Sequence, residues 1–203
     1  RSTDASEVFA GCADGSVESL LHSIVPAAGD FVHIRPGVPH AAFGDVELLE
    51  ISESSSLDFC LCTWGQPVGT EEFDESMNLE EALDFIDYNA WTAPEKPAAR
   101  EGDAGLRLID LPEFSVMRLA LNAPLRICSG DSDSFSLYSC LSGGASVQLE
   151  VLGQTANFPI AAGVTLLVPA ECPDFVLAPT ARDTLLLETT VAPRAEKDSY
   201  IKE

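Results

Sequence analysis

A histidine beside a tight turn is the first residue in this sequence whose type and place suggest chemistry. His40 follows Gly29 by eleven residues and comes just after Pro36-Gly37. This pattern predicts a strand, a turn and a histidine at the start of the returning strand. A neutral imidazole is a common metal ligand. A histidine that only satisfies its own turn is the plainer alternative, and both interpretations stay open here.

Two charged residues near His40 have the types that a site would need. Glu50 lies in the apolar run 48–51, where a carboxylate is costly unless it is paired or bound to a metal. Arg35 is the one cation beside the turn, and a guanidinium is well suited to hold an anion. A surface salt bridge is the commoner role of such an arginine. For Glu50, a role in a site and no such role are equally open.

Composition narrows the class of partner and compartment. The chain has 203 residues with 33 acidic and 11 basic side chains, a net charge of 11 − 33 = −22. Such a surface repels phosphate backbones and anionic lipid, so we expect neither nucleic-acid nor membrane binding. Its six cysteines form no CxxC pair, and no secretory leader is visible. We therefore expect reduced thiols and a cytoplasmic protein.

Short apolar runs bounded by turn residues dominate the chain and predict an all-β fold. One helix is expected at 78–86, where residues 79, 82, 83 and 86 have helical spacing and Asn78 is placed as an N-cap. A shorter helix is expected near 17–24. The expected strands are 31–34, 46–51, 57–62, 114–121, 135–141, 147–152, 164–168 and 184–189.

The sequence also echoes itself. Ala27-Ala28-Gly29 and the turn before His40 can be laid on Ala161-Ala162-Gly163 and the turn before Asp174, both at an offset of 134. We interpret this as two copies of one β-unit, the second with an acid in place of the histidine. The expected division is a first unit at 1–88, a linker rich in proline at 89–103 and a second unit at 104–203.

These segments together resemble a known family. Residues 29–41, the run Leu48-Leu49-Glu50-Ile51, the tract 57–66 and the acidic segment 79–87 are similar, in order and spacing, to type I mannose-6-phosphate isomerases of the cupin superfamily. Residues 135–190 resemble the metal-free C-terminal cupin of that family. The resemblance implies two cupin-like β-barrel or jelly-roll units with a small helical segment between them.

The resemblance also implies an activity and its site. The family interconverts mannose 6-phosphate and fructose 6-phosphate, using zinc to polarise the sugar oxygens and a base to move a proton. His40 matches a metal ligand, and Glu50 matches an active-site glutamate. Arg35 is a candidate for the phosphate. A sugar phosphate is thus the expected partner.

Several positions depart from the family pattern. The active-site arginine falls at Cys60, and the aspartate four residues earlier falls at Ser56. The other metal ligands belong to an N-terminal half without a counterpart here, and one imidazole cannot hold a catalytic zinc. Further N-terminal residues or another chain of a homo-oligomer are the expected sources. The alternative is a catalytically degenerate cupin that binds a sugar or sugar phosphate without turnover.

Other metal-site arrangements are also open. His33, His40 and Glu50 are one possible set. Cys60 and Cys62, which share a strand face, are a second possible set together with His40. A core imidazole is the plainer interpretation of His33.

Overall fold

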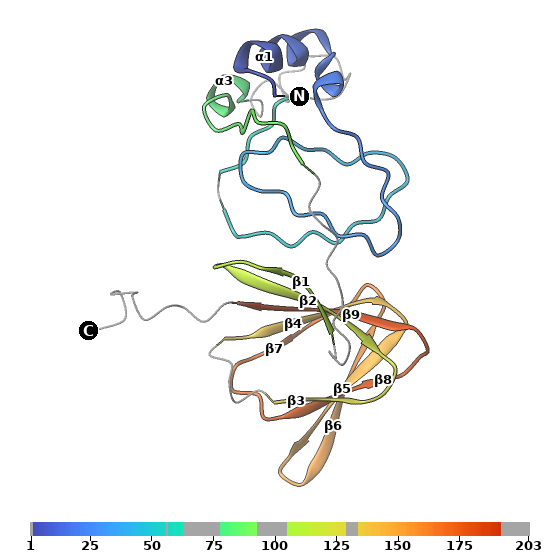
Figure 1. Cartoon of the computed structure of the whole chain (residues 1–203). Helices are drawn as coiled ribbons and strands as arrows, with labels where there is room; N and C mark the ends of the chain where they lie inside the picture. Colours follow the sequence, from blue (N-terminus) through green and yellow to red (C-terminus); the bar gives the residue numbers. More distant parts are fainter. Residues whose placement is uncertain (1, 56, 63–77, 93–104, 129–133, 192–203) are drawn as a thin grey trace, which may run out of the picture. The chain divides into compact units, whose positions relative to one another are not determined.

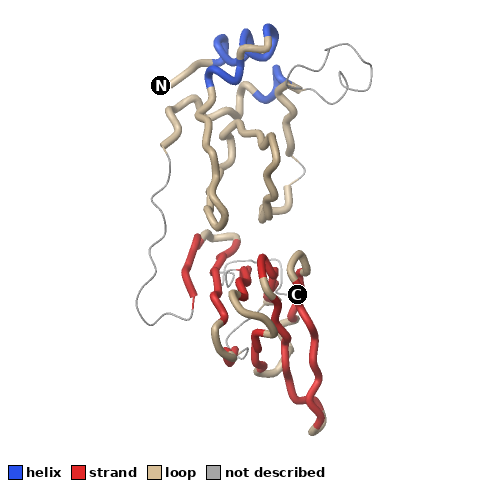
Figure 2. Tube along the Cα trace, turned by 90° about the vertical axis from the view of Figure 1, so that its right-hand side faces the viewer, coloured by secondary structure: helices blue, strands red, loops and turns tan. Residues whose placement is uncertain are grey.

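A computed structural model describes residues 2–55, 57–62, 78–92, 105–128 and 134–191. The chain divides into two compact units, residues 1–95 and 96–203, and each is described by itself. Helices and irregular segments make up the described part of the first unit, and strands dominate the second (Figure 1, Figure 2). The expected linker at 89–103 lies mostly outside the described residues. No helix in the described part is long and apolar enough to cross a membrane.

The second unit is a two-sheet jelly roll. Its five-stranded sheet has the order β1-β2-β9-β4-β7, and its four-stranded sheet has the order β3-β8-β5-β6. All of these neighbours pair antiparallel. The strands are β1 (Gly105–Asp110), β2 (Phe114–Leu121), β3 (Leu125–Ile127), β4 (Ser136–Ser142), β5 (Gly144–Val151), β6 (Gln154–Ala161), β7 (Thr165–Val168), β8 (Phe175–Pro179) and β9 (Thr184–Val191).

This strand order is the double Greek key of jelly rolls, the architecture that cupins share, with β1 added at one edge. The prediction of an all-β, cupin-like fold is confirmed by the second unit, to which all nine strands of the described residues belong. The expected strands from residue 114 onward correspond to β2, β4, β5, β7 and β9.

Alternation along the strands builds the core of the second unit. Leu119 on β2 pairs with Leu186 on β9, which pairs with Cys140 on β4. All three side chains are at most 2% exposed and belong to one cluster. Because successive side chains of a strand point to opposite faces, one face of each strand enters this core. Toward one end the same face becomes polar, since Glu188 and Thr190 follow Leu186 at two-residue steps.

The first unit contains a helix that the sequence analysis missed. Helix α1 spans Ala5–Asp14; the Asp4 side chain caps it by accepting from the Glu7 N–H, and Gly15 ends it with φ 78°. Asp4 followed three residues later by Glu7 is a capping signal that the apolar spacing alone did not reveal. The helix expected at 17–24 is a 3-10 turn, η1 (Val17–Leu20).

The expected helix at 78–86 is shorter than predicted. Helix α3 covers only Leu79–Ala82, and Asn78 makes no side-chain capping bond. Its amide instead joins a neighbouring segment: Asn78 Oδ1 accepts from the Cys60 N–H at 3.1 Å, and Nδ2 donates to the Asp58 carbonyl at 3.4 Å. The acidic segment therefore forms one helical turn, and the Asn78 side chain joins two segments of the chain instead of capping the helix.

The expected strands of the first unit are not strands. Residues 21–55 contain no strand in the structure, including the segments 31–34 and 46–51 that the sequence analysis assigned as strands. Alternating apolar residues show that a segment could bury one face in a sheet. A strand forms only where a neighbouring strand supplies the backbone hydrogen bonds. For 57–62, only Cys60 takes part in a β-bridge.

The turns of the internal repeat are present in both units. Asp30 N–H donates to the Ala27 carbonyl at 3.0 Å, and Val164 N–H to the Ala161 carbonyl at 3.0 Å. The glycines of these turns, Gly29 and Gly163, have φ 85° and 80°. The second turn recurs as well, from Val38 to Arg35 and from Cys172 to Pro169, each at 3.1 Å. All four turns keep the offset of 134 found in the sequence.

Candidate functional site

A β-turn fastened to a distant segment positions the candidate site. Pro36 and Gly37 occupy its central positions, and Gly37 has φ 83°, the conformation that a type II turn requires there. The Asp87 N–H donates to the Gly37 carbonyl at 2.8 Å. A Cβ at Gly37 would lie 2.6 Å from the Phe85 carbonyl oxygen, so only glycine permits this close approach.

His40 lies at the exit of this turn with its ring exposed. Its Nδ1 is 3.0 Å from the Val38 carbonyl oxygen. Because a carbonyl only accepts, Nδ1 is the donor in this contact, and in a neutral ring Nε2 then carries the lone pair. The turn thus favours the tautomer in which the Nε2 lone pair is available to a metal or to a substrate hydroxyl. The cupin resemblance implies a histidine that points into the barrel, and the exposed ring of His40 does not agree with that expectation.

Arg35 begins the turn and forms an exposed ion pair. Its Nη2 is 3.4 Å from Asp87 Oδ2, and 66% of the arginine side chain is exposed. Hydrogen bonds from the Asn89 backbone N–H and side chain, with the nearby Arg35 charge, lower the pKa of the Asp87 carboxyl. Exposed pairs of this length contribute little to stability. An anion can therefore compete for the Arg35 guanidinium at small cost.

Glu50 is also exposed, and so are its neighbours Leu48 and Leu49. The sequence argument assumed that the apolar run would bury the carboxylate, and that assumption is wrong for this structure. An exposed carboxylate has no desolvation cost to offset, so the energetic argument for a role of Glu50 in a site no longer applies. Its assignment as the catalytic residue stays a prediction from the family resemblance.

The described residues do not fit a zinc ion. Among them, no group of three or more histidine, cysteine, aspartate or glutamate side chains is placed to hold a metal. This applies to the set of His33, His40 and Glu50 and to the set of Cys60, Cys62 and His40. A catalytic zinc takes three protein ligands.

The cysteine at the arginine position lies in a partly buried cluster. Cys60 and Cys62 are both half-buried, and Phe59 stacks on Phe85 with ring centroids 5.2 Å apart. Cys12 on α1 interacts with Cys62, and burial first, then this neighbour, raises the pKa of the Cys12 thiol to about 11. The acidic run at 71–75 and the end of the 57–66 tract lie outside the described residues.

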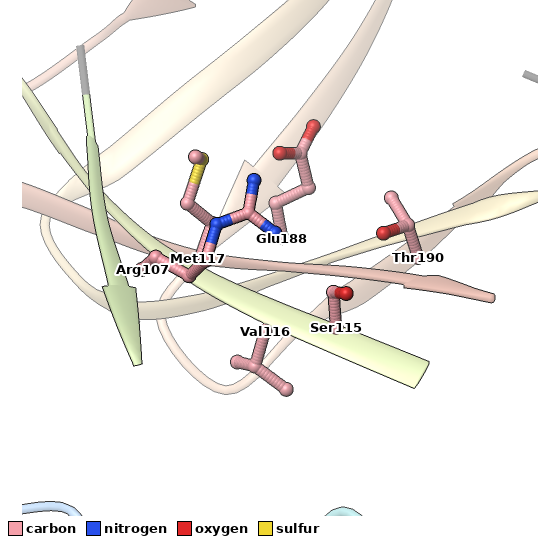
Figure 3. A pocket seen from close by; sticks show the side chains of 6 residues that line it. All are labelled: Arg107, Ser115, Val116, Met117, Glu188 and Thr190. Carbon is pink, nitrogen blue, oxygen red and sulfur yellow. The ribbon is translucent and has the colours of Figure 1, made fainter. Parts of the chain in front are cut away.

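A small polar cavity in the second unit was not predicted from the sequence. It measures about 50 Å³ and is lined by Arg107, Ser115, Val116, Met117, Glu188 and Thr190. In Figure 3, Met117 and Glu188 lie on one side of the sheet and Val116 points away from them. Tyr138 donates to Glu188 Oε1 at 2.5 Å, and burial together with this carboxylate raises the pKa of Tyr138. The volume suits ordered water and is too small for a sugar.

The position equivalent to His40 in the second unit is held by an ion pair. Asp174 accepts from Arg126 Nη2 at 3.0 Å, which links the turn before β8 to strand β3. The Asp174 carboxylate, with its charge, raises the pKa of Arg126. The same place in the repeat therefore carries a histidine in one unit and a salt bridge in the other.

Comparison with known proteins gives a likeness of fold. No family model matches the sequence, and no curated protein matches it. Solved structures do. Mannose 6-phosphate isomerase from Bacillus subtilis is 18% identical with a TM-score of 0.44. A phosphomannose isomerase variant from Salmonella typhimurium is 13% identical with a TM-score of 0.43. A cupin superfamily protein from Desulfitobacterium hafniense is 18% identical with a TM-score of 0.36.

The matched shares differ among these structures. The match covers 56% of this chain and 34% of the Bacillus protein, and 57% and 28% for the Salmonella protein. For the Desulfitobacterium protein it covers 46% of this chain and 82% of that protein. The chain thus spans about a third of the length of the Bacillus protein. The all-β architecture rests on the strand pairing of the second unit.

Proposed function

We propose that this protein is mannose-6-phosphate isomerase-like and that it binds a sugar phosphate beside the 35–38 turn. The observation that carries the proposal is that one turn has on its two sides His40, whose Nδ1 contact leaves Nε2 available, and Arg35, which makes only an exposed ion pair. A guanidinium recognises a phosphate, and an imidazole exchanges hydrogen bonds with sugar hydroxyls. The sequence resemblance of residues 29–51 supplies the substrate class.

Binding without turnover is the form of the proposal that the described residues favour. They hold no three-ligand metal group, and the position of the family's arginine carries Cys60, which cannot stabilise a developing negative charge. The free cysteines support the proposed cytoplasmic location, since thiols persist in reducing compartments.

Isomerisation is the second candidate, favoured by His40 and Glu50 at positions that match the family. It requires zinc ligands from beyond the described residues. A coupled assay for the conversion of mannose 6-phosphate to fructose 6-phosphate, with and without added zinc, separates the two forms. We expect no turnover in either condition. Zinc-dependent turnover with about one bound equivalent would establish the enzyme instead.

A thermal unfolding series tests binding itself. A ligand that binds only the folded state raises the Tm, and the rise grows with the logarithm of the ligand concentration above Kd. We expect mannose 6-phosphate to raise the Tm and mannose to leave it unchanged, because the phosphate supplies the charge-assisted contact. An equal rise with inorganic phosphate alone would reduce the site to an anion site and contradict sugar recognition.

A further inference from the structure

The hairpin of β5 and β6 extends an apolar strip beyond the core of the second unit. Phe158 is paired with Val147, a core residue, and Val151 lies on the same face of β5, with the pair of Leu149 and Ala156 between them. Phe158 is nevertheless 45% exposed and Val151 47%. The tip of the hairpin projects from the other strands of the unit in both views (Figure 1, Figure 2). Neighbouring apolar side chains that stay this open mark an interaction surface.

The turn at the tip of the hairpin adds a second signal. Leu152 and Gly153 form the two-residue loop between β5 and β6, with φ 52° and 76°. Positive φ at both positions is the type I′ turn, which favours asparagine, aspartate or glycine at the first of them. A leucine is unfavourable there, and Leu152 is 100% exposed, so packing within the described chain does not offset the cost. Such an outlier points to a contact outside the chain.

Strand β6 is also the least protected sheet edge among the described strands. The two sheets end in β1, β7, β3 and β6. Strands β3 and β7 have only three and four residues, and β1 carries Arg107, Asp110 and an irregular register. Short length, charge and bulges are means by which proteins prevent pairing at an edge. Strand β6 has eight residues and no charge, and only Pro159 interrupts its backbone donors.

The absence of charge around β6 selects the partner. Residues 151–161 contain no charged side chain, in a chain of which 22% of the residues are charged. Acidic surfaces elsewhere repel a second copy of this chain, whereas this stretch does not. A strongly basic or acidic partner gains no charge pairing here, and the core of a homodimer interface is depleted of charge. A second copy brings the same uncharged edge and the same apolar strip, and a two-fold axis lets each copy cover the other.

From these observations we propose that two copies of this chain associate through β6, whose strands pair antiparallel about a two-fold axis at Ala156. The two four-stranded sheets then become one continuous sheet. Thr155 of one copy lies opposite Asn157 of the other. The pairing stops before Pro159, which has no N–H to donate.

This arrangement also covers the apolar strip. Because the axis is perpendicular to the sheet, both strips lie on one face of the joined sheet. Gln154 of one copy lies opposite Phe158 of the other, so each Phe158 comes beside the hairpin tip that carries Val151 and Leu152. The proposal goes beyond sugar-phosphate binding and does not depend on it, because it uses no residue of the 35–38 turn.

A charge swap in the full chain tests the pairing. One double variant is Thr155→Lys with Asn157→Lys, and the other is Thr155→Glu with Asn157→Glu. Each places like charges opposite each other across the axis, so we expect each variant to dimerise at least about tenfold more weakly than the wild type in sedimentation equilibrium. Mixing the two variants, with one fluorescently labelled, should restore a heterodimer, because lysine then faces glutamate.

The mixture also guards against a variant that fails to fold, since only folded chains can form the heterodimer. The lysines lower the net negative charge, so their effect does not come from overall repulsion. Asn122 and Ala123 are exposed in the loop between β2 and β3, and Asn122→Lys with Ala123→Lys should dimerise like the wild type. A wild type that is monomeric at about 100 μM would overturn the proposal. So would equal weakening by the control, or a mixture that forms no heterodimer.

A substitution at the hairpin tip separates folding from association. Asparagine is favoured at the first position of a type I′ turn, so Leu152→Asn should raise the Tm of the dilute, monomeric protein. The same variant should weaken the dimer about fivefold or more, because it removes an apolar contact. A variant that dimerises as tightly as the wild type would exclude the tip from the interface and contradict the proposed geometry.

Amide hydrogen exchange on the unaltered protein locates the contact. Exchange within residues 154–158 should slow as the protein concentration rises, because pairing between copies protects those amides. Concentration-dependent protection confined to other residues would refute association through β6. Protection of 154–158 that appears only with an added uncharged strand peptide, and never with concentration, would assign this edge to another protein and also overturn the proposal.

Discussion

One buried hydroxyl is paired with one carboxylate within the five-stranded sheet. Tyr138 is 1% exposed, its ring meets Phe175 edge-on at 5.8 Å, and its hydroxyl donates to Glu188 on the neighbouring strand β9. A buried polar group is costly unless it is hydrogen-bonded. The bond from Tyr138 therefore allows a glutamate to lie beside the apolar core. The pair also orients Glu188 at the small polar cavity.

Removing the Tyr138 hydroxyl should destabilise the second unit. Tyr138→Phe leaves the Glu188 oxygen without its donor, and we expect a loss of about 1–3 kcal/mol in the free energy of unfolding at pH 7. Urea denaturation followed by circular dichroism measures it. A variant as stable as wild type would mean that water replaces the hydroxyl at no cost.

The same hydroxyl gives a signed pH dependence. The folded-state pKa of Tyr138 is raised above the ordinary value of 10.0, so the folded state keeps this proton when the unfolded state loses it. Its contribution is fully present below pH 10 and declines as pH rises through the folded-state pKa. Stability should therefore fall more steeply above pH 10 in wild type than in Tyr138→Phe. Identical slopes would exclude this origin.

Thiol reactivity should distinguish the cysteines. Cys12 has a pKa raised to about 11, so little of it is thiolate at pH 8, whereas Cys128 is exposed. Because the thiolate is the nucleophile, we expect Cys128 to react with a disulfide reagent well before Cys12. Peptide mapping after brief labelling measures the order. Faster labelling of Cys12 would show that the burial around α1 is looser than described.

At the scale of elements, glycines form two of the turns that join consecutive strands. Gly143 and Gly153 both have positive φ, at 72° and 76°, and they stand in the turns after β4 and β5. They differ in surroundings. A Cβ at Gly143 would lie 2.6 Å from Thr184 Oγ1 and 2.8 Å from Thr184 Cα, whereas nothing lies within 4 Å of one at Gly153.

This contrast gives a matched pair of substitutions. Gly153→Ala should cost only the strain of its backbone conformation, on the order of 1 kcal/mol. Gly143→Ala adds a clash with Thr184, which is 2% exposed and donates to the Gly144 carbonyl at 2.8 Å. We expect it to cost at least ~1 kcal/mol more. Equal unfolding free energies for the two variants would contradict the described packing.

The elements also show what sequence reasoning could and could not predict. The turns at Gly29 and Gly37 were predictable, because proline and glycine at fixed spacing determine local backbone angles. The jelly-roll strands followed from alternation. The segments 31–34 and 46–51 carry the same alternation without forming strands, since a pattern does not say whether a partner is present. The expected burial of Glu50 was wrong for that reason. The expected N-cap role of Asn78 was wrong because its amide bonds a segment distant in sequence.

For the whole molecule, the balance of charge sets behaviour in solution. Most of the net charge of −22 resides in the first unit, with −17 against −5 in the second. Mutual repulsion among these carboxylates opposes the compact state and is screened by salt. The same field favours cationic partners over anionic ones.

Salt should therefore stabilise the protein. Raising sodium chloride from about 10 mM to about 300 mM shortens the screening length from roughly 30 Å to under 10 Å, so we expect the Tm to increase. Differential scanning calorimetry at pH 7 measures the change. A Tm that falls over this range would mean that attractive ion pairs, such as that of Arg126 with Asp174, outweigh the repulsion.

Isothermal titration of the metal-free protein with mannose 6-phosphate is the most direct test of the central claim. We predict saturable binding without zinc, weakened about fivefold or more by Arg35→Ser and unchanged by Arg182→Ser, a matched charge loss in the exposed loop between β8 and β9. No heat of binding to the metal-free protein, or equal weakening by both variants, would contradict recognition of a sugar phosphate at the 35–38 turn.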